Sequence, residues 1–336
     1  MNRPLVSVIM PVFNAERYLR DSLVSILNQT YKNMEVIIVD DECTDASMEI
    51  INAFNDPRIT IIRNAKNLGL AACLNKAIQS SKGSFLARMD ADDSARPERI
   101  AKQVEFLEAN PGIDIVGSSM RYFGYSDHLH VFPETHEECR IQLLFNVCFG
   151  HPTVVFRKNV FDMPENFYDE ALKQYSEEYD LWCRLANRYR FHNLKEVLLD
   201  YRTYPPDIKT GSEEKRKKNS LVIRQNYLIA TLGTATAQEL ALHARMSMME
   251  KVRTREDLLA CDQWLNKIAD LNRQRQIFHG DRLVRRLARL FFELCYHNSG
   301  RGFFSLGYYY SSPWSAIYKP PLQIMAKFVL KSILKK

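Results

Sequence analysis

The first 120 residues alternate two kinds of segment, and this alternation limits the folds open to the chain. Segments with apolar residues at helical spacing, such as Ala15–Gln29 and Leu70–Ser80, separate short apolar runs. These runs predict strands at Leu5–Met10, Val36–Val39, Ile59–Ile62, Phe85–Met89 and Ile113–Ser118, and the first two are expected to be buried. We therefore predict the α/β class, with a single mostly parallel sheet that carries helices on both faces.

Polar residues follow several of the predicted strands, at the points where the strands end. Pro11 is expected to end the first strand, and Asn14 follows it. Asp40 and Asp41 come at the end of the second strand, and residues 90–93 come at the end of the fourth. Ligands of such sheets bind beyond the carboxyl ends of the strands. We expect an active site at this edge.

Residues 90–93 read Asp-Ala-Asp-Asp and form the densest acidic group near a predicted strand end. Three carboxylates in four residues repel one another and usually need a cation to coexist. A set of oxygen ligands alone suits Mg²⁺ or Mn²⁺, held jointly with substrate phosphates. The alternative interpretation is that Asp92 or Asp93 caps the next helix, or that the loop is simply solvated.

Two other acidic pairs are candidates for chemistry. Asp40 and Asp41 would accept hydrogen bonds from the base or ribose of a ligand, or they would form the entry turn of a helix. Glu177 and Glu178 begin a predicted helix and would supply a general base. The alternative interpretation is that both glutamates lie in a solvated first turn of the helix, where acids are stabilised by the helix dipole.

Composition and missing motifs exclude several classes of function. The chain has 336 residues and a net charge of +6, but no zinc-finger spacing, no RNP-like aromatic motif and no long Lys/Arg block, so we expect no nucleic-acid partner. No G-x-G-x-x-G follows the first strand, which disfavours a dinucleotide dehydrogenase. Seven scattered cysteines and no long apolar run predict a cytoplasmic protein, either free or peripheral on the cytoplasmic face of a membrane.

The chain changes character in its second half. A polar stretch near residues 205–215 predicts a boundary, with a catalytic domain at 1–210 and a helical C-terminal region at 211–336. Residues 301–336 contain Arg and Lys but no Asp or Glu, and residues 325–336 alternate lysines with apolar residues at helical spacing. This basic amphipathic tail would bind an anionic membrane surface. The alternative is a terminal helix packed on its domain with the lysines in solvent.

Several motifs in register resemble those of family 2 glycosyltransferases, which have the glycosyltransferase A-type (GT-A) fold. They cover roughly residues 4–205 and run in the expected order: LVSVIMPVFNAERYL, Gln29-Thr30, VIIVDDECTD, NLGLAACLNKAI, FLARMDADD with Pro97-Glu98-Arg99, His151-Pro152-Thr153 and EEYDLWCRL. The sequence departs from the family pattern at Glu42-Cys43, where Gly-Ser is usual, and at Glu178, where Asp is usual.

The resemblance implies a nucleotide-sugar site and a metal. Asp41, with or without Asp40, would read the base, which is most often uracil. Asp90 and Asp92, with Asp93 beside them, would hold the ribose and an Mn²⁺ or Mg²⁺ ion. Asn67 and Arg88 would lie near the diphosphate or donor sugar. The whole nucleotide-sugar site implied by the resemblance comprises Pro11, Phe13, Asn14, Glu16, Asp40, Asp41, Asn67, Arg88, Asp90, Ala91 and Asp92.

The resemblance also implies an inverting transferase with Glu178 as the catalytic base, or Asp180 if the register is shifted. The enzyme would move a hexosyl or N-acetylhexosaminyl group from a UDP-sugar to a hydroxyl of a glycan or lipid-linked acceptor. Surface polysaccharide, lipopolysaccharide or capsule synthesis would be its setting. The alternative is an inactive nucleotide-sugar-binding or scaffold protein of the same fold. Glu178 in place of Asp favours that alternative, and the intact Asp90 and Asp92 oppose it.

Overall fold

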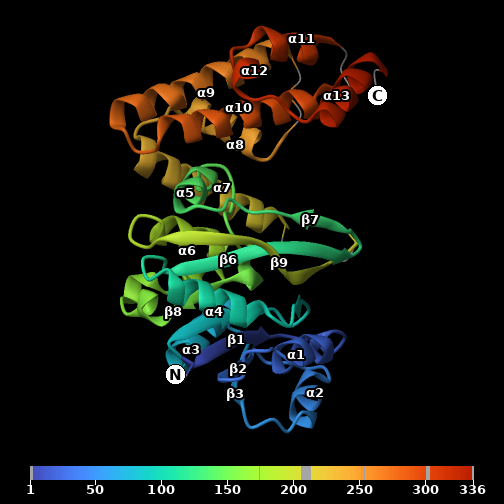
Figure 1. Ribbon diagram of the computed structural model, residues 1–336, viewed down its shortest axis with the longest axis vertical. Coiled ribbons are helices and arrows are strands. Elements are labelled where there is room, and N and C mark those ends of the chain that lie inside the picture. Colours follow the sequence, from blue (N-terminus) through green and yellow to red (C-terminus); the bar gives the residue numbers. More distant parts are fainter. Residues whose placement is uncertain are drawn as a thin grey trace. The chain divides into compact units, whose positions relative to one another are not determined.

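The computed structural model describes residues 3–173, 175–205, 213–250, 252, 254–299 and 303–334. Its contacts group the chain into two compact units. The first unit comprises residues 1–140 and 147–220 and contains the sheet, and the second comprises residues 141–146 and 221–336 and is helical (Figure 1). The two units therefore interleave in sequence at residues 141–146.

One sheet dominates the first unit. Within the described residues it has nine strands in the order β3-β2-β1-β4-β8-β6-β9-β5, with β7 beside β6. The strands are β1 (Val6–Val12), β2 (Met34–Asp40), β3 (Ile59–Arg63), β4 (Phe85–Arg88), β5 (Ser94–Ala95), β6 (Ile115–Gly124), β7 (His128–His130), β8 (Val155–Arg157) and β9 (Phe191–Thr203).

The direction of the strands changes across the sheet. Strands β3, β2, β1 and β4 are parallel, as the alternation of strands and helices predicts. Strand β8 is antiparallel to both β4 and β6, while the long strand β9 runs parallel to β6 and antiparallel to β5. The predicted α/β fold with its helical extension is confirmed, and the parallel half of the sheet is the half that the sequence defines best.

Strand β1 extends past Pro11 to Val12, so the prediction that Pro11 ends it is wrong. Pairing with β4 stops at Ile9, whereas pairing with β2 continues to Val12 opposite Asp40. A proline lacks the amide donor of the ladder, and it is tolerated where one neighbouring strand has already ended. The extension carries β1 to the edge where the polar residues gather.

Helices cover both faces of the sheet. The side chains of Val6, Val8 and Met10 share one apolar cluster with the first, second and fourth helices, whereas α3 contacts β1 and β2 and its apolar residues lie outside that cluster. Successive residues of a strand point to opposite faces, which fits this division. The helices that begin in this unit are α1 (Leu19–Leu27), α2 (Ser47–Ala53), α3 (Leu70–Ser80), α4 (Arg99–Ala109), α5 (His136–Leu143), α6 (Glu177–Leu185) and α7 (Glu213–Leu232).

Helix α1 begins four residues later than the sequence predicts. The amides of Ala15 and Glu16 donate to the side chains of Ser47 and Asp45 instead of entering a helix. Side-chain acceptors of this kind compete with helical hydrogen bonds. The loop after β1 is thereby tied to the loop after β2.

The second unit consists of helices that pack through apolar faces. Buried residues of α10 at helical spacing include Leu283, Leu287, Leu290, Phe291 and Leu294. None of the helices in the described part of the chain has the length and apolarity needed to cross a membrane. The helices that lie wholly in this unit are α8 (Ala237–Ser247), α9 (Arg255–Arg275), α10 (Gly280–His297), α11 (Phe303–Ser311), α12 (Trp314–Ile317) and α13 (Leu322–Leu334).

Candidate active site

A cavity of about 630 Å³ opens at the carboxyl ends of β1, β2 and β4. This volume lies within the usual range of small-molecule sites, about 300–1,000 Å³. The strand-end positions predicted from the sequence converge there. Those that line it are Pro11, Phe13, Asn14, Asp41, Asn67, Asp90, Ala91 and Asp92.

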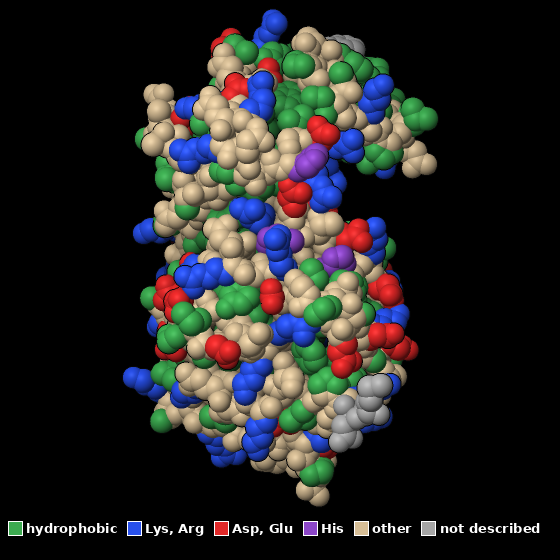
Figure 2. All heavy atoms as spheres, turned by 60° about the vertical axis from the view of Figure 1, so that its left-hand side comes forward, with side chains coloured by type: hydrophobic (Ala, Val, Ile, Leu, Met, Phe, Trp, Pro, Cys, Tyr) green, Lys and Arg blue, Asp and Glu red, His purple; other side chains and the backbone are tan. Residues whose placement is uncertain are grey.

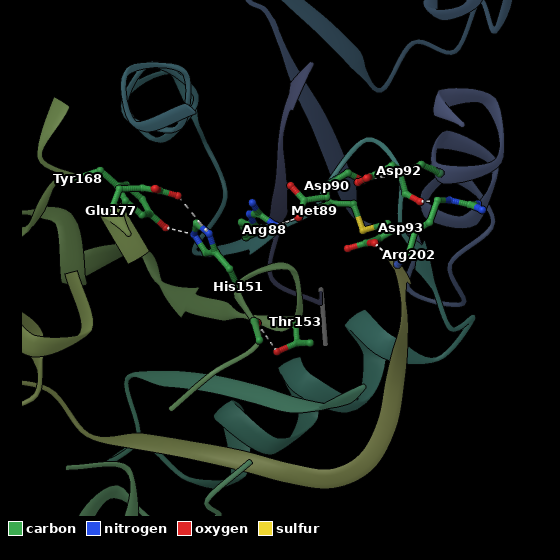
Figure 3. A network of polar contacts seen from close by, with 12 residues as sticks. Arg88, Met89, Asp90, Asp92, Asp93, His151, Thr153, Tyr168, Glu177 and Arg202 are labelled. Atoms are coloured by element: carbon green, nitrogen blue, oxygen red, sulfur yellow. Dashed lines mark hydrogen bonds and ion pairs between the residues drawn. The ribbon is translucent and has the colours of Figure 1, made fainter. Parts of the chain in front are cut away.

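Asp90, Asp92 and Asp93 form one acidic cluster on the loop between β4 and β5. One carboxylate oxygen of each lies within 4.8 Å of the others, a spacing that fits a shared metal ion. Each carboxylate also has its own protein partner (Figure 3). Asp90 forms an ion pair with Arg88, Asp92 accepts a hydrogen bond from the hydroxyl of Tyr204 at 2.6 Å, and Asp93 accepts the amide of Arg202 at 2.8 Å.

Burial makes this cluster electrostatically costly. Burial first, and then repulsion from Asp90 and Asp92, raises the pKa of Asp93 well above its usual range. Burial and Asp90 also raise the pKa of Asp92, and the hydrogen bond from Tyr204 opposes that rise. The buried Oδ2 of Asp93 has no hydrogen-bond partner among the described residues. An additional cation would offset this repulsion, so the three carboxylates fit a divalent metal.

Side chains from three elements hold the backbone of this loop. Ser22 of α1 donates to the carbonyl of Asp90 at 2.7 Å, and Arg202 of β9 donates to the carbonyl of Asp92 at 2.9 Å. Arg99 of α4 donates to the carbonyl of Arg88 at 2.7 Å. Burial, followed by repulsion from Arg88, lowers the pKa of Arg99 to about 9. The position of the carboxylates therefore depends on residues far apart in the sequence.

Asp41 is buried just after β2 and is held by three donors from the chain itself. It accepts hydrogen bonds at 2.8 Å from the amides of Leu68 and Gly69 and from the side chain of Asn64. Gly69 has a φ of 90°, a left-handed conformation that glycine adopts without a steric cost. Asp41 still lines the cavity, whereas Asp40 accepts the amide of Cys43 and does not.

The loop after β1 forms another wall of the cavity. Asn14 has a φ of 46°, which asparagine tolerates better than most residues, and its side chain accepts the amide of Thr44. Phe13 is 53% exposed, so a face of its ring is open to a planar ligand. Glu16 accepts the amide of Ala46 and does not line the cavity, so it orders the loop.

A second acidic group, Glu177 and Glu178, lies at the N-terminus of α6. Ligand atoms of both residues and of His151 lie within 4.8 Å of one another. His151 Nδ1 is 3.7 Å from Glu177, and its Nε2 shares a 2.8 Å hydrogen bond with Tyr168. In Figure 3, Arg88 lies between His151 and Asp90, so the second group is a close neighbour of the first.

Burial dominates the electrostatics of the second group. Burial, followed by the charge of Arg88, lowers the pKa of His151 well below its usual range. Burial and the adjacent Glu178 raise the pKa of Glu177 well above the usual range, and burial also raises the pKa of Glu178. The neutral forms of His151 and Glu177 are therefore favoured, and the nearby Arg88 disfavours a second cation.

Glu178 and Asp180 have different surroundings. Glu178 does not line the cavity; burial raises its pKa, and the charge of Arg216, which does line the cavity, opposes that rise. Asp180 pairs with Arg184 at 2.7 Å, and the same arginine donates to the carbonyls of Glu165 and Phe167. Asp180 is thus engaged in fixing α6, and Glu178 is the acid better placed for chemistry.

Several cavity residues have no counterpart in the sequence-based predictions. Tyr201 and Tyr204 come from the end of β9 and just beyond it, Tyr175 precedes α6, and Arg216 lies in the first turns of α7. Arg17 and Tyr18 lie within the motif LVSVIMPVFNAERYL, but the sequence assigns them no role. Only the fold brings them together, because more than 100 residues separate the tyrosines of β9 from the Asp90 loop in sequence.

Comparisons with known proteins agree with this geometry. The family model described as glycosyl transferase family 2 matches residues 7–162. An uncharacterized glycosyltransferase of Methanocaldococcus jannaschii is 36% identical over 211 residues, which is 60% of this chain and 72% of that protein. This chain belongs to glycosyl transferase family 2. The O-antigen biosynthesis glycosyltransferase WbnJ of Escherichia coli is another relative of this family 2 chain, 34% identical over 209 residues, or 60% of this chain and 80% of WbnJ.

Solved structures of other glycosyltransferases share the fold of this family 2 protein. TarS of S. aureus, crystallised as residues 1–349 with UDP, aligns with a TM-score of 0.56 and 16% identity over 97% of this chain and 88% of that chain. The mannosyltransferase PcManGT from Pyrobaculum calidifontis, in complex with GDP-Man and Mn²⁺, aligns with a TM-score of 0.54 and 18% identity over 100% of this chain and 89% of that chain. At these identities the likeness concerns the fold.

Proposed function

We propose that this family 2 glycosyltransferase moves a hexosyl or N-acetylhexosaminyl group from a nucleoside-diphosphate donor, most simply a UDP-sugar, to an acceptor hydroxyl with inversion. One observation carries the proposal: the carboxylates of Asp90 and Asp92 face a cavity large enough for such a donor, with Asp41 on its wall. The relative WbnJ is named for O-antigen biosynthesis, and we extend that setting, the synthesis of a surface polysaccharide, to this chain.

The first acidic cluster would hold a divalent cation, Mn²⁺ or Mg²⁺, through Asp90 and Asp92, with Asp93 behind them. Bound there, the ion would act as a Lewis acid and neutralise the charge of the diphosphate leaving group. Arg88 orients Asp90 and Tyr204 orients Asp92. Partners of this kind, one step away from a metal ligand, commonly tune the affinity for the metal.

Other cavity residues would bind the rest of the donor. The exposed ring of Phe13 and the edge of Asp41 lie where a nucleoside base and ribose fit. Arg17 and Arg216 also line the cavity and provide cationic groups for the diphosphate. Binding energy of this kind positions C1 of the donor for attack, which is the larger part of catalysis in such reactions.

Glu178 would act as the general base. As the acceptor oxygen attacks C1, Glu178 accepts its proton and the bond between C1 and the diphosphate oxygen breaks, so the nucleoside diphosphate leaves with the bonding pair. A single displacement from the opposite face inverts the anomeric centre. Base catalysis contributes about 10²–10⁴ in rate. His151 and Glu177, held in neutral forms by burial, would add no competing charge beside this step.

The test is release of nucleoside diphosphate from a panel of UDP- and GDP-sugars, with Mn²⁺, with Mg²⁺ and with EDTA. We expect slow hydrolysis of one donor by the wild type, abolished by EDTA and by Asp92→Ala. The matched control is Asp162→Ala, an exposed aspartate outside the cavity, which should match the wild type. Tight binding of a nucleoside diphosphate without release from any donor, with or without acceptor glycans, would indicate an inactive relative and contradict the proposal.

A further inference from the structure

Helix α13 carries an apolar strip that no described part of the chain covers. Leu322, Leu330, Ile333 and Leu334 are 88%, 55%, 50% and 62% exposed, and all lie on one side of the helix. Their spacing of eight, three and one residues confines them to about a third of the helix circumference. Figure 2 shows hydrophobic side chains gathered on the surface of the C-terminal helices, interspersed with Lys and Arg. An exposed strip of this kind indicates a binding surface.

The opposite side of α13 is firmly packed within the same unit. Phe328 is fully buried and its ring contacts Phe292 and Tyr296 of α10 and Tyr309 of α11. Ser332, one turn later, is also buried. The helix therefore has its docked face, and the strip is an additional apolar face directed into solvent.

Lysines border the strip, and no acids accompany them. Lys327 and Lys331 are exposed and lie one turn apart along its edge. Lys319 is exposed just before the helix, and residues 301–336 contain no Asp or Glu. An apolar face bordered by cations is the arrangement of helices that lie in the headgroup region of a membrane. There the apolar residues enter the acyl boundary and the lysines reach lipid phosphates.

We propose that α13 docks the protein on an anionic lipid bilayer, with the helix parallel to the membrane plane. A second copy of the chain is a poorer occupant, because pairing two such strips would bring the lysine borders together with no acid in the segment to offset them. This inference goes beyond the proposed transfer reaction and does not depend on the identity of the donor. It favours acceptors held at a membrane over acceptors free in solution.

The test is flotation of the full chain with vesicles of phosphatidylcholine alone and with vesicles that also contain phosphatidylglycerol. We expect binding only to the second kind, weakened by salt. Lys327→Glu with Lys331→Glu should weaken binding by at least about 25-fold, since each lysine near an anionic surface contributes about fivefold and each glutamate adds repulsion. Leu330→Glu with Ile333→Glu should weaken it by at least about tenfold, because the apolar face no longer inserts.

Leu259→Glu is the matched control, because Leu259 is an exposed leucine of α9 in the same unit. It should bind vesicles as the wild type does, and all variants should keep the donor hydrolysis and unfolding temperature of the wild type. Absence of binding to anionic vesicles by the wild type would overturn the proposal. So would equal binding by the Leu330→Glu, Ile333→Glu variant, or a dimer in solution that this variant dissolves.

Discussion

The two acidic groups of the first unit, Asp90 with Asp92 and Glu177 with Glu178, differ in their hydrogen-bond partners and in their burial. Asp90 and Asp92 face the cavity and are each held by a donor, Arg88 and Tyr204. Glu177 is buried with an Oε2 that has no hydrogen-bond partner among the described residues, and burial raises its pKa well above the usual range. Orienting donors hold the carboxylates of the first pair in place at the cavity. Burial raises the pKa of both glutamates, which makes each carboxylate a stronger base, so similar side chains acquire different chemistry from their surroundings.

The largest expected effect is on turnover, and it distinguishes Glu178 from Asp180. Glu178→Gln should lower turnover by about 10²–10⁴ because the amide cannot accept the proton of the acceptor. Asp180→Asn should keep turnover but lower the unfolding temperature, because it breaks the ion pair with Arg184. Steady-state rates and thermal melts of both variants measure this difference, with the exposed Glu105→Gln as the control. Full activity of Glu178→Gln, or inactivity of folded Asp180→Asn, would move the base to Asp180.

A smaller expected effect, on the Mn²⁺ requirement, tests whether the hydrogen bond from Tyr204 orients Asp92. Tyr204→Phe removes the hydrogen bond to Asp92 and should raise the Mn²⁺ concentration needed for half-maximal activity by about tenfold, the usual cost of losing such a partner. Activity at saturating Mn²⁺ should recover. Tyr175→Phe is the control, because Tyr175 lines the same cavity but is not the residue that donates to Asp92. An unchanged metal requirement would mean that Tyr204 does not position Asp92 when the metal is bound.

The smallest expected effect is on stability and concerns Glu177. Its pKa is raised by burial, so the wild type loses stability as pH rises from the ordinary carboxyl range through that raised pKa. Glu177→Gln cannot ionise, so it should match the wild type in acid and melt a few degrees higher at neutral pH, the shift that roughly 1 kcal/mol gives in a unit of this size. Thermal melts across pH test this, and a variant less stable than the wild type at neutral pH would show that Glu177 is needed as an anion.

Much of the fold follows from the sequence because the parallel half of the sheet is built from local signals. The runs around Val8, Val36 and Ile61 are short, β-branched and bounded by turns, so each alone predicts a strand. Strands β5 and β7 are too short to give such a pattern; β7 pairs with the neighbouring strand β6, but the pairing of β5 with β9 depends on contacts distant in sequence. Long-range pairing of this kind has no local signature.

The candidate site likewise combines residues that the sequence predicts with residues that only the fold brings together. Asp41, Asp90 and Asp92 stand at strand ends, so topology alone predicts that they meet. Tyr204 and Arg216 line the same cavity from segments with no recognisable motif, and only the folded chain shows them. The sequence also cannot tell that Asp180 is engaged by Arg184 whereas Glu178 is not, because both acids lie in the first turns of one helix.

One comparison tests the division between the two acidic groups most directly. It is the dissociation constant, in the presence of Mn²⁺, of the nucleoside diphosphate selected by the donor panel, measured by calorimetry for Asp92→Ala and Glu178→Gln. The account predicts that Asp92→Ala weakens binding by at least about tenfold, since a metal ligand is lost, while Glu178→Gln binds as the wild type and fails only in turnover. Equal weakening of binding in both variants, or in neither, would contradict it.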